Sequence, residues 1–120
     1  MDETQKPKAY DLGERTFLFA KRVLAYVNKL SRIVTNIEIG RQLVRSAGSI
    51  GANYIEAEEA LSRKDFVMRI KISRKEAKES IYWLRLSAPE EEQIKEKEEL
   101  LQEATELMKI FGSIVEKCKK

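Results

Sequence analysis

Between Asn36 and Leu86, apolar residues recur at helical spacing along two long segments, and no strand-like alternation appears anywhere in the 120-residue chain. In the first segment the apolar side chains alternate at steps of four and three, which is typical of a helix that packs against neighbours. This stripe comprises Leu43, Ala47, Ile50, Tyr54, Ala57 and Leu61. Beside it lies a second apolar edge of Val44, Gly48, Ala52 and Ile55, so we expect the helix to be covered on two sides.

Periodicity and capping signals together predict four helices. The expected ranges are about 11–30, 36–61, 62–86 and 89–118. Ser62 opens an S-x-x-D capping box, and Pro89 suits the first position of a new helix. Because short connections make consecutive helices antiparallel neighbours, we expect an all-α fold, an antiparallel up-down-up-down four-helix bundle over residues 11–120. Residues 1–10 lack periodicity and are expected to form a flexible N-terminal arm.

The expected helices carry more apolar surface than one small bundle can cover. In the first helix we expect a core face of Phe17, Ala20, Leu24 and Val27, with Leu12, Phe19, Val23 and Leu30 alongside. In the third we expect a core face of Phe66, Ile70, Ala77, Ile81 and Leu84, and a second apolar line of Met68, Ile72, Trp83 and Leu86. Gly40, Gly48 and Gly51 each cost about 1 kcal/mol of helix propensity relative to Ala, which indicates close backbone approach. We therefore expect copies of the chain to assemble.

The residue types present argue against catalysis and cofactor binding. Histidine is absent, and the single Cys118 permits neither an intrachain disulfide nor a zinc site. We expect no enzymatic activity, no cofactor and no metal; a metal enzyme would need carboxylates such as Glu56, Glu76 and Glu79 to converge. The lone cysteine and the missing signal peptide indicate a cytoplasmic setting. No apolar run approaches the ~18 residues of a membrane span, so no membrane partner is expected.

A polar stripe follows the side of the second helix that lacks large apolar residues. Its members are Gln42, Arg45, Ser46, Ser49, Asn53 and Glu56. Structurally, this pattern is typical of a hydrogen-bonded seam or a solvated face; functionally, it would be a ligand or assembly contact. Arg45 needs a partner from another helix, and Glu79, on an otherwise apolar line of the third helix, is the candidate because an acid is costly to bury unpaired.

A basic strip occupies one face of the third helix. It consists of Lys71, Arg74, Lys75, Lys78 and Arg85, with the aromatic Tyr82 on the same face. Contacts to nucleic-acid phosphates need such a surface. The alternative is that the strip pairs with the acidic start of the fourth helix, since residues 63–89 hold eight Lys and Arg against three acids and residues 90–106 hold eight Glu against two Lys.

One run of the sequence resembles a known family. From Gly40 to Leu86 the chain contains Q-L-x-R-S-A-x-S-I-G-A-N, then E-A, S-x-K-D-F, K-E-A-K-E and Y-W-L. These motifs occupy residues 42–53, 56–57, 62–66, 75–79 and 82–84, and they resemble the bacterial 23S ribosomal RNA intervening-sequence family. The family is in turn similar to the accessory protein of diversity-generating retroelements. The resemblance implies a four-helix bundle that assembles as a homopentamer, often with a basic surface suggested to bind nucleic acid.

The residues and the resemblance together predict a non-enzymatic, oligomeric, nucleic-acid-associated accessory or scaffold protein. The partners expected are further copies of the chain, five in a closed ring as the resemblance implies, and RNA or DNA. The alternative is a protein–protein interaction adaptor that ignores nucleic acid. It would use the polar stripe and the C-terminal tail as docking surfaces.

Overall fold

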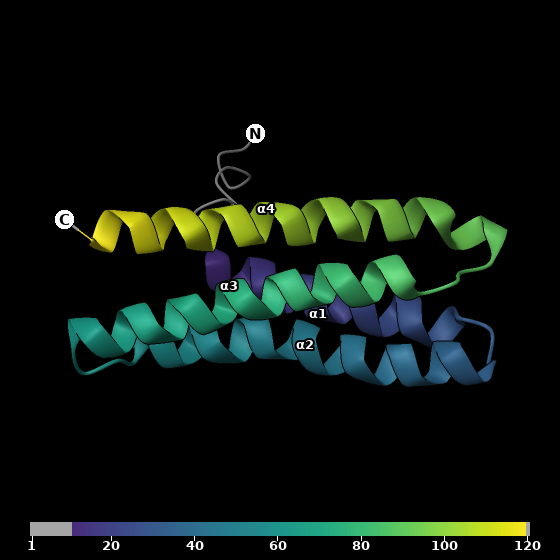
Figure 1. Cartoon of the computed structure of the whole chain (residues 1–120), viewed down its shortest axis with the longest axis horizontal. Helices are drawn as coiled ribbons and strands as arrows, with labels where there is room; N and C mark the ends of the chain where they lie inside the picture. The colour runs from purple at the N-terminus through teal and green to yellow at the C-terminus, as the bar shows by residue number, and fades with distance from the viewer. Residues whose placement is uncertain (1–10, 120) are drawn as a thin grey trace.

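The computed structural model describes residues 11–119 and confirms the expected all-α bundle. The helices are α1 (Leu12–Lys29), α2 (Val34–Glu58), α3 (Arg63–Leu86) and α4 (Ile94–Cys118), and a short 3-10 turn, η3 (Glu91–Gln93), precedes α4. The helices run side by side along the long axis, with α4 above, α2 below, and α3 in front of α1 (Figure 1). α3 therefore packs between α2 and α4, and α1 lies diagonally across the bundle from it. The expected N-terminal arm, residues 1–10, lies outside the described residues.

Side-chain caps explain where two of the helices begin. The Asp11 carboxylate accepts a hydrogen bond from the Glu14 backbone N–H at 3.0 Å, just before α1. The Ser62 hydroxyl accepts one from the Asp65 N–H at 3.0 Å, which confirms the predicted cap of α3. Each cap satisfies a backbone donor that the first turn of a helix leaves unpaired.

Two helix ends differ from the sequence-based prediction. α2 ends at Glu58, so Leu61 lies in the turn to α3 and is 97% exposed rather than part of the core stripe. α4 begins at Ile94 rather than at Pro89. The intervening 3-10 turn buries Gln93, whose Nε2 donates to the Tyr26 carbonyl oxygen at 3.1 Å and ties this corner to α1.

The core face of α1 is rotated relative to the expected one. Phe17 is 58% exposed and Leu24 is 47% exposed. The buried face consists of Leu12, Thr16, Phe19, Val23 and Tyr26. Its two polar members are satisfied, because the Thr16 hydroxyl donates to the Leu12 carbonyl oxygen at 2.8 Å and the Tyr26 hydroxyl lies 2.7 Å from the Ser87 hydroxyl. The line expected alongside the core face, Leu12, Phe19, Val23 and Leu30, is therefore the buried one. The prediction left out the hydrogen-bonded polar residues Thr16 and Tyr26, which complete this face.

Two of the three α2 glycines mark close contacts between α1 and α2. A Cβ on Gly40 would lie 2.8 Å from Val27 Cγ1, and one on Gly51 would lie 3.1 Å from Thr16 Oγ1. A Cβ on Gly48 would meet nothing within 4 Å. The predicted close approach is therefore confirmed at Gly40 and Gly51, whereas Gly48 lies on the open side of α2.

Candidate nucleic-acid interface

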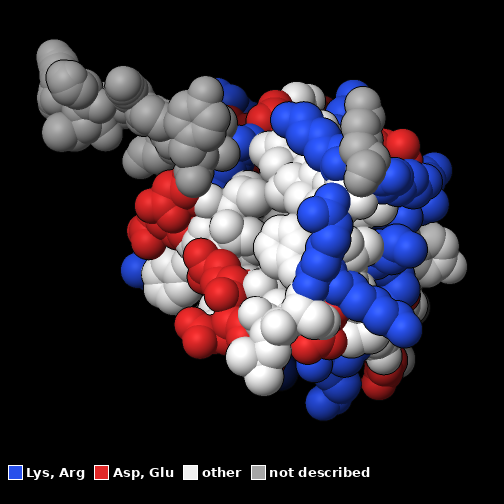
Figure 2. Space-filling model, turned by 90° about the vertical axis from the view of Figure 1, so that its left-hand side faces the viewer, with Lys and Arg blue, Asp and Glu red and all other residues white. Residues whose placement is uncertain are grey.

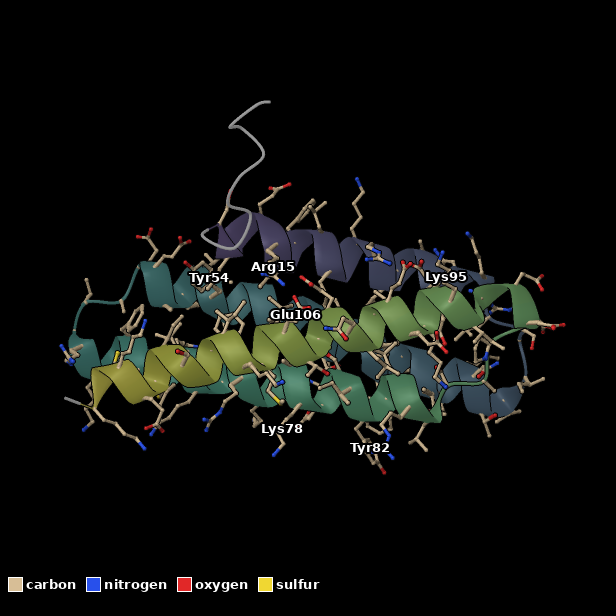
Figure 3. The ribbon with its side chains drawn as sticks, turned by 90° about the horizontal axis from the view of Figure 1, so that it is seen from above. Arg15, Tyr54, Lys78, Tyr82, Lys95 and Glu106 are labelled. Carbon is tan, nitrogen blue, oxygen red and sulfur yellow. The ribbon has the colours of Figure 1, made fainter. Side chains whose placement is uncertain are left out.

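The basic strip lies on the face of α3 that points away from the core. Lys71, Lys75, Lys78 and Arg85 are exposed, while Arg74 is half-buried. The core side of the same helix is formed by Ile70, Ser73, Ala77, Ser80 and Leu84. Lys78 and the labelled Tyr82 project from α3 in the same outward direction (Figure 3). From Lys71 to Arg85 the strip spans about 21 Å at 1.5 Å per residue.

The cations of the basic strip have no carboxylate partner within the part of the chain that the structure describes. None of the five takes part in an ion pair among residues 11–119. Viewed along the bundle, Lys and Arg gather on the side of α3 while Asp and Glu gather on the opposite side (Figure 2). This concentration of one charge sign produces a positive field that attracts anions.

The acidic start of α4 pairs with α1, not with the strip. Arg15 Nε lies 2.7 Å from Glu103 Oε2 and its Nη2 lies 2.6 Å from Glu106 Oε1, and the side chains face one another between the two helices (Figure 3). Arg22 Nη2 lies 2.8 Å from Glu99 Oε1. The expected charge pairing of helices is thus present, but the alternative that α4 neutralises the basic strip is wrong.

These α1–α4 pairs alter the acidity of the groups involved. Hydrogen bonds from Gln102 and then from Arg15 hold the pKa of the Glu106 carboxyl below its usual range. The hydrogen bond to Glu103 raises the pKa of the Arg15 guanidinium. The Glu106 carboxylate and the Arg15 guanidinium therefore both stay ionised at neutral pH, which preserves the ion pair between them.

Two hollows flank the middle of the basic strip. One, of about 730 Å³, is lined by Lys71, Arg74, Lys75, Lys78 and Met108. The other, of about 580 Å³, is lined by Gln42, Arg45, Lys75, Lys78, Glu79, Tyr82 and Trp83. The first lies between α3 and α4 and contains no acidic residue, and the second lies between α3 and α2. Lys75 and Lys78 line both, so they form the ridge between them.

The polar stripe of α2 is largely a seam with α3. Arg45 Nη2 donates to Glu79 Oε1 at 3.1 Å, which confirms the partner predicted for Arg45. Asn53 Nδ2 donates to the Ser49 carbonyl oxygen at 2.9 Å, and Arg69 Nη1 donates to Asn53 Oδ1 at 2.9 Å. The structural interpretation of the stripe therefore holds for Arg45, Ser49 and Asn53.

The two ends of the stripe are placed differently. Gln42 is half-buried and lines the hollow between α2 and α3, and Glu56 is exposed and takes part in no ion pair among residues 11–119. Within the same residues, no group of three or more acidic, Cys or His side chains is placed to hold a metal ion. No described helix has both the length and the apolar character needed to cross a membrane.

Ser46, a member of the predicted polar stripe, lies inside the α2–α3 seam, where its hydroxyl is 2.8 Å from that of Ser80. The sequence prediction missed Ser73, Ser80 and Met108. The Ser73 hydroxyl donates to the Ile50 carbonyl oxygen at 2.9 Å. Met108 comes from α4 to line a hollow of the strip. The serines carried a signal, because they recur at the same spacing as the core residues of α3. Met108 carried none, because its position depends on how α4 packs against α3.

The geometry defines the class of this protein, which is an all-α four-helix bundle with one outward basic face. The chain belongs to the 23S rRNA-intervening sequence protein family, whose model matches residues 8–113. It is similar to the crystal structure of a protein of unknown function of the S23 ribosomal protein family from Bacteroides thetaiotaomicron, with a TM-score of 0.77 and 33% identity over 92% of this chain and 99% of that one. No curated protein sequence matches the chain significantly.

Proposed function

We propose that this protein is a non-enzymatic accessory or scaffold protein that binds nucleic acid and acts as a cytoplasmic homo-oligomer. The observation that carries the proposal is the basic strip of α3, whose five cations have no carboxylate partner among residues 11–119. Membership of a family named for an intervening sequence in ribosomal RNA supports RNA as the first ligand to test. We propose an RNA–protein complex as the setting, which follows from the resemblance of the sequence motifs to the retroelement accessory protein.

The physical basis of binding is the release of counterions from phosphates. Each Lys or Arg that contacts a phosphate releases condensed cations, so affinity falls steeply with salt and depends little on sequence. Free lysines suit this purpose because no internal ion pair must be broken first. An Arg such as Arg15, held by two carboxylates, is not available in this way.

Uncovered apolar residues support assembly. Ile55 on α2 is 57% exposed, and Met68 and Leu86 on α3 are 45% and 48% exposed. These residues belong to the second apolar edges that the sequence predicts to need a partner. Gly48 lies on the same open edge of α2, where the absence of a side chain allows another helix to approach closely. We propose a closed ring of five copies, the number implied by the family resemblance, because a ring buries such edges on every subunit.

Binding is tested by fluorescence anisotropy with labelled oligonucleotides at about 50 mM and about 200 mM salt. We expect binding at the lower salt and a steep loss at the higher one. A Lys71→Gln/Lys78→Gln double variant should reduce the slope of log K against log salt by about 2. The matched control is Lys21→Gln/Lys29→Gln, which removes two exposed charges from α1 and should leave the slope unchanged. No binding of RNA or DNA at about 50 mM salt would overturn the proposal and favour the protein-binding adaptor.

Assembly is tested by light scattering and sedimentation. The chain has a mass of 13.9 kDa, and we expect a species of five times that mass at micromolar concentration. An Ile55→Glu variant places a charge on the open edge and should dissociate the oligomer while helix content stays unchanged. The matched control, Leu24→Glu, alters an exposed apolar residue of α1 that is 47% exposed and lies away from this edge, and it should leave the oligomer intact. A monomer in the unsubstituted protein would overturn the oligomer proposal without affecting the binding test.

A further inference from the structure

We propose that the basic strip holds an unpaired strand of nucleic acid, and that one base of this strand stacks on Tyr82 in the hollow between α2 and α3. This inference rests on the proposed function and names the ligand class of the same surface. Single-stranded RNA and single-stranded DNA both meet this description, because each joins unpaired bases through a phosphate backbone.

The ridge and the two hollows provide different environments side by side. The ridge of Lys75 and Lys78 is purely cationic and suits the phosphates. The hollow of about 580 Å³ on the α2 side combines these lysines with the rings of Tyr82 and Trp83 and the amide of Gln42. A nucleotide is complementary to this surface, because it joins a charged phosphate to a planar base that has polar edges. The strand can therefore follow the ridge while a base turns into the hollow.

Tyr82 is well placed to receive a base. Its side chain is 55% exposed although it is aromatic, and it projects outward beside Lys78 (Figure 3). Its ring packs edge-to-face with Trp83, with centroids 5.0 Å apart and an interplanar angle of 75°. This contact restrains the ring at little cost while its outer surface remains in solvent. Exposed aromatic rings within a cationic groove are the usual stacking platforms for single strands.

The polar groups of the hollow suit a base edge. Gln42 is half-buried, and its amide makes no hydrogen bond among residues 11–119. A carboxamide both donates and accepts, so it can pair with the edge of a base. Arg45 lines the same hollow, but its Nη2 lies 3.1 Å from Glu79 Oε1, so its charge is already paired.

The shape of the surface favours a single strand over a duplex. A helix that reads duplex DNA must enter a groove about 12 Å wide, which requires it to protrude from its domain. α3 instead lies between α2 and α4 with only its outer face free (Figure 1). Its cations stand in one row of about 21 Å, which matches one phosphate backbone rather than two. A paired base also cannot offer its face to Tyr82, because its neighbours cover it.

The first experiment compares one labelled 20-nucleotide sequence as a single strand and as a duplex at equal salt, as RNA and as DNA. A purely electrostatic surface would prefer the duplex, which has the higher charge density. We expect the single strand to bind at least 5-fold more tightly. Equal or tighter binding of the duplex would overturn the inference but leave the proposed function standing. If neither the single strand nor the duplex bound, both the inference and the proposed function would be overturned.

The second experiment substitutes Tyr82. We expect Tyr82→Leu, which keeps an apolar side chain but loses the aromatic face, to weaken single-strand binding by about 5- to 100-fold and to leave duplex binding unchanged. Tyr82→Phe should retain most of the affinity. Since Tyr82 is more than half exposed, both variants should keep the helix content of the parent. An affinity of Tyr82→Leu equal to that of the parent protein would refute the stacking site.

Trp83 provides an independent signal. It is the only tryptophan of the chain and lines the hollow proposed for the base. Its emission should change on titration with unlabelled single strand and stay unchanged with duplex. The Lys71→Gln/Lys78→Gln variant should bind more weakly yet reach the same final emission, because it loses phosphate contacts rather than the stack. Unchanged emission at saturating single strand would place the base elsewhere and overturn the inference.

Discussion

The guanidinium of Arg45 on α2 lies with its Nη1 3.5 Å from Oε1 of Glu76, a carboxylate on α3 that is only 6% exposed. The same Arg45 also holds the more exposed Glu79 through its Nη2. Glu76 Oε1 forms no hydrogen bond within the described residues, so the ion pair with Arg45 is its main compensation for burial. One half-exposed arginine therefore neutralises both acids on this side of α3.

Replacing Arg45 by alanine should destabilise the protein. The substitution leaves the buried Glu76 carboxylate without a counter-charge, and we expect the free energy of unfolding to fall by about 1–3 kcal/mol, less than for a fully buried pair because Arg45 is half exposed. Urea denaturation monitored by circular dichroism measures the change. Adding Glu76→Gln in the same chain should recover part of the loss, since it removes the orphaned charge.

The matched control is Arg41→Ala on the same helix. Arg41 pairs with Glu38 at 4.0 Å, and both side chains are mostly exposed. Such surface pairs contribute little, so the free energy of unfolding should change by less than about 0.5 kcal/mol. Equal effects of Arg41→Ala and Arg45→Ala would show that Glu76 does not depend on Arg45.

Adding a methyl group at Gly40 should separate α1 from α2. The new Cβ would lie 2.8 Å from Val27 Cγ1, and valine is a stiff side chain that cannot turn away easily. We expect Gly40→Ala to lower the free energy of unfolding by about 1–2 kcal/mol, despite the better helix propensity of alanine. Combining it with Val27→Ala should relieve the clash. A stability of Gly40→Ala equal to that of the parent would contradict the close packing of these helices.

Gly48→Ala is the opposite case. Because nothing lies within 4 Å of the added Cβ, the protomer should gain about 0.5–1 kcal/mol from helix propensity. If this edge meets another copy closely, the same variant should weaken the oligomer. Denaturation of dilute protein and sedimentation of concentrated protein separate the two effects.

Tyr26 should make stability sensitive to alkaline pH. Burial raises the pKa of its hydroxyl above 10.0, although the hydrogen bond with Ser87 opposes this. The unfolded chain therefore ionises Tyr26 first, so its contribution is fully present below pH 10 and is lost as pH rises further. Tyr26→Phe should cost about 1 kcal/mol at neutral pH, and its deficit should shrink as the pH rises above about 10. A constant deficit across this range would contradict the prediction.

Met108 offers a way to alter the basic strip from a neighbouring helix. It lines the hollow of Lys71, Arg74, Lys75 and Lys78, so Met108→Glu would place a carboxylate among four cations. We expect oligonucleotide affinity at about 50 mM salt to fall by about 10-fold or more, since the new charge competes with phosphate. Met108→Gln is the control for size and polarity and should retain affinity. Similar affinities for the two variants would indicate that the ligand does not approach this hollow.

Much of the bundle was predictable because its signals are local. The helix periodicity, the Ser62 cap and the stripe from Leu43 to Ala57 each depend on residues within a few turns of one another. The pairing of Arg45 with Glu79 was also accessible, since an acid on an apolar line needs a partner. A contact between two helices can thus be inferred from sequence when a charge on an apolar line has few oppositely charged side chains within reach.

The errors arose where tertiary packing chose between similar faces. In α1, Phe17 and Val23 lie on different sides of the helix, and only packing against α2 and α4 selects the side with Val23. The helix that pairs with the α4 acids could not be predicted for the same reason, because α1 and α3 both lie next to α4 and both carry arginines. The hollows beside the basic strip require residues from three helices, which no pattern along a single segment reveals.

The order of the helices has a consequence for how the chain reaches its native state. Each helix packs against the one that follows it, through short turns, so most native contacts form between segments that are close in sequence. Chains of this topology fold rapidly, commonly in microseconds to milliseconds, because little loop-closure entropy is lost before contacts form. A newly made subunit would therefore complete its own structure first, and encounters between subunits would join finished surfaces rather than unfolded segments.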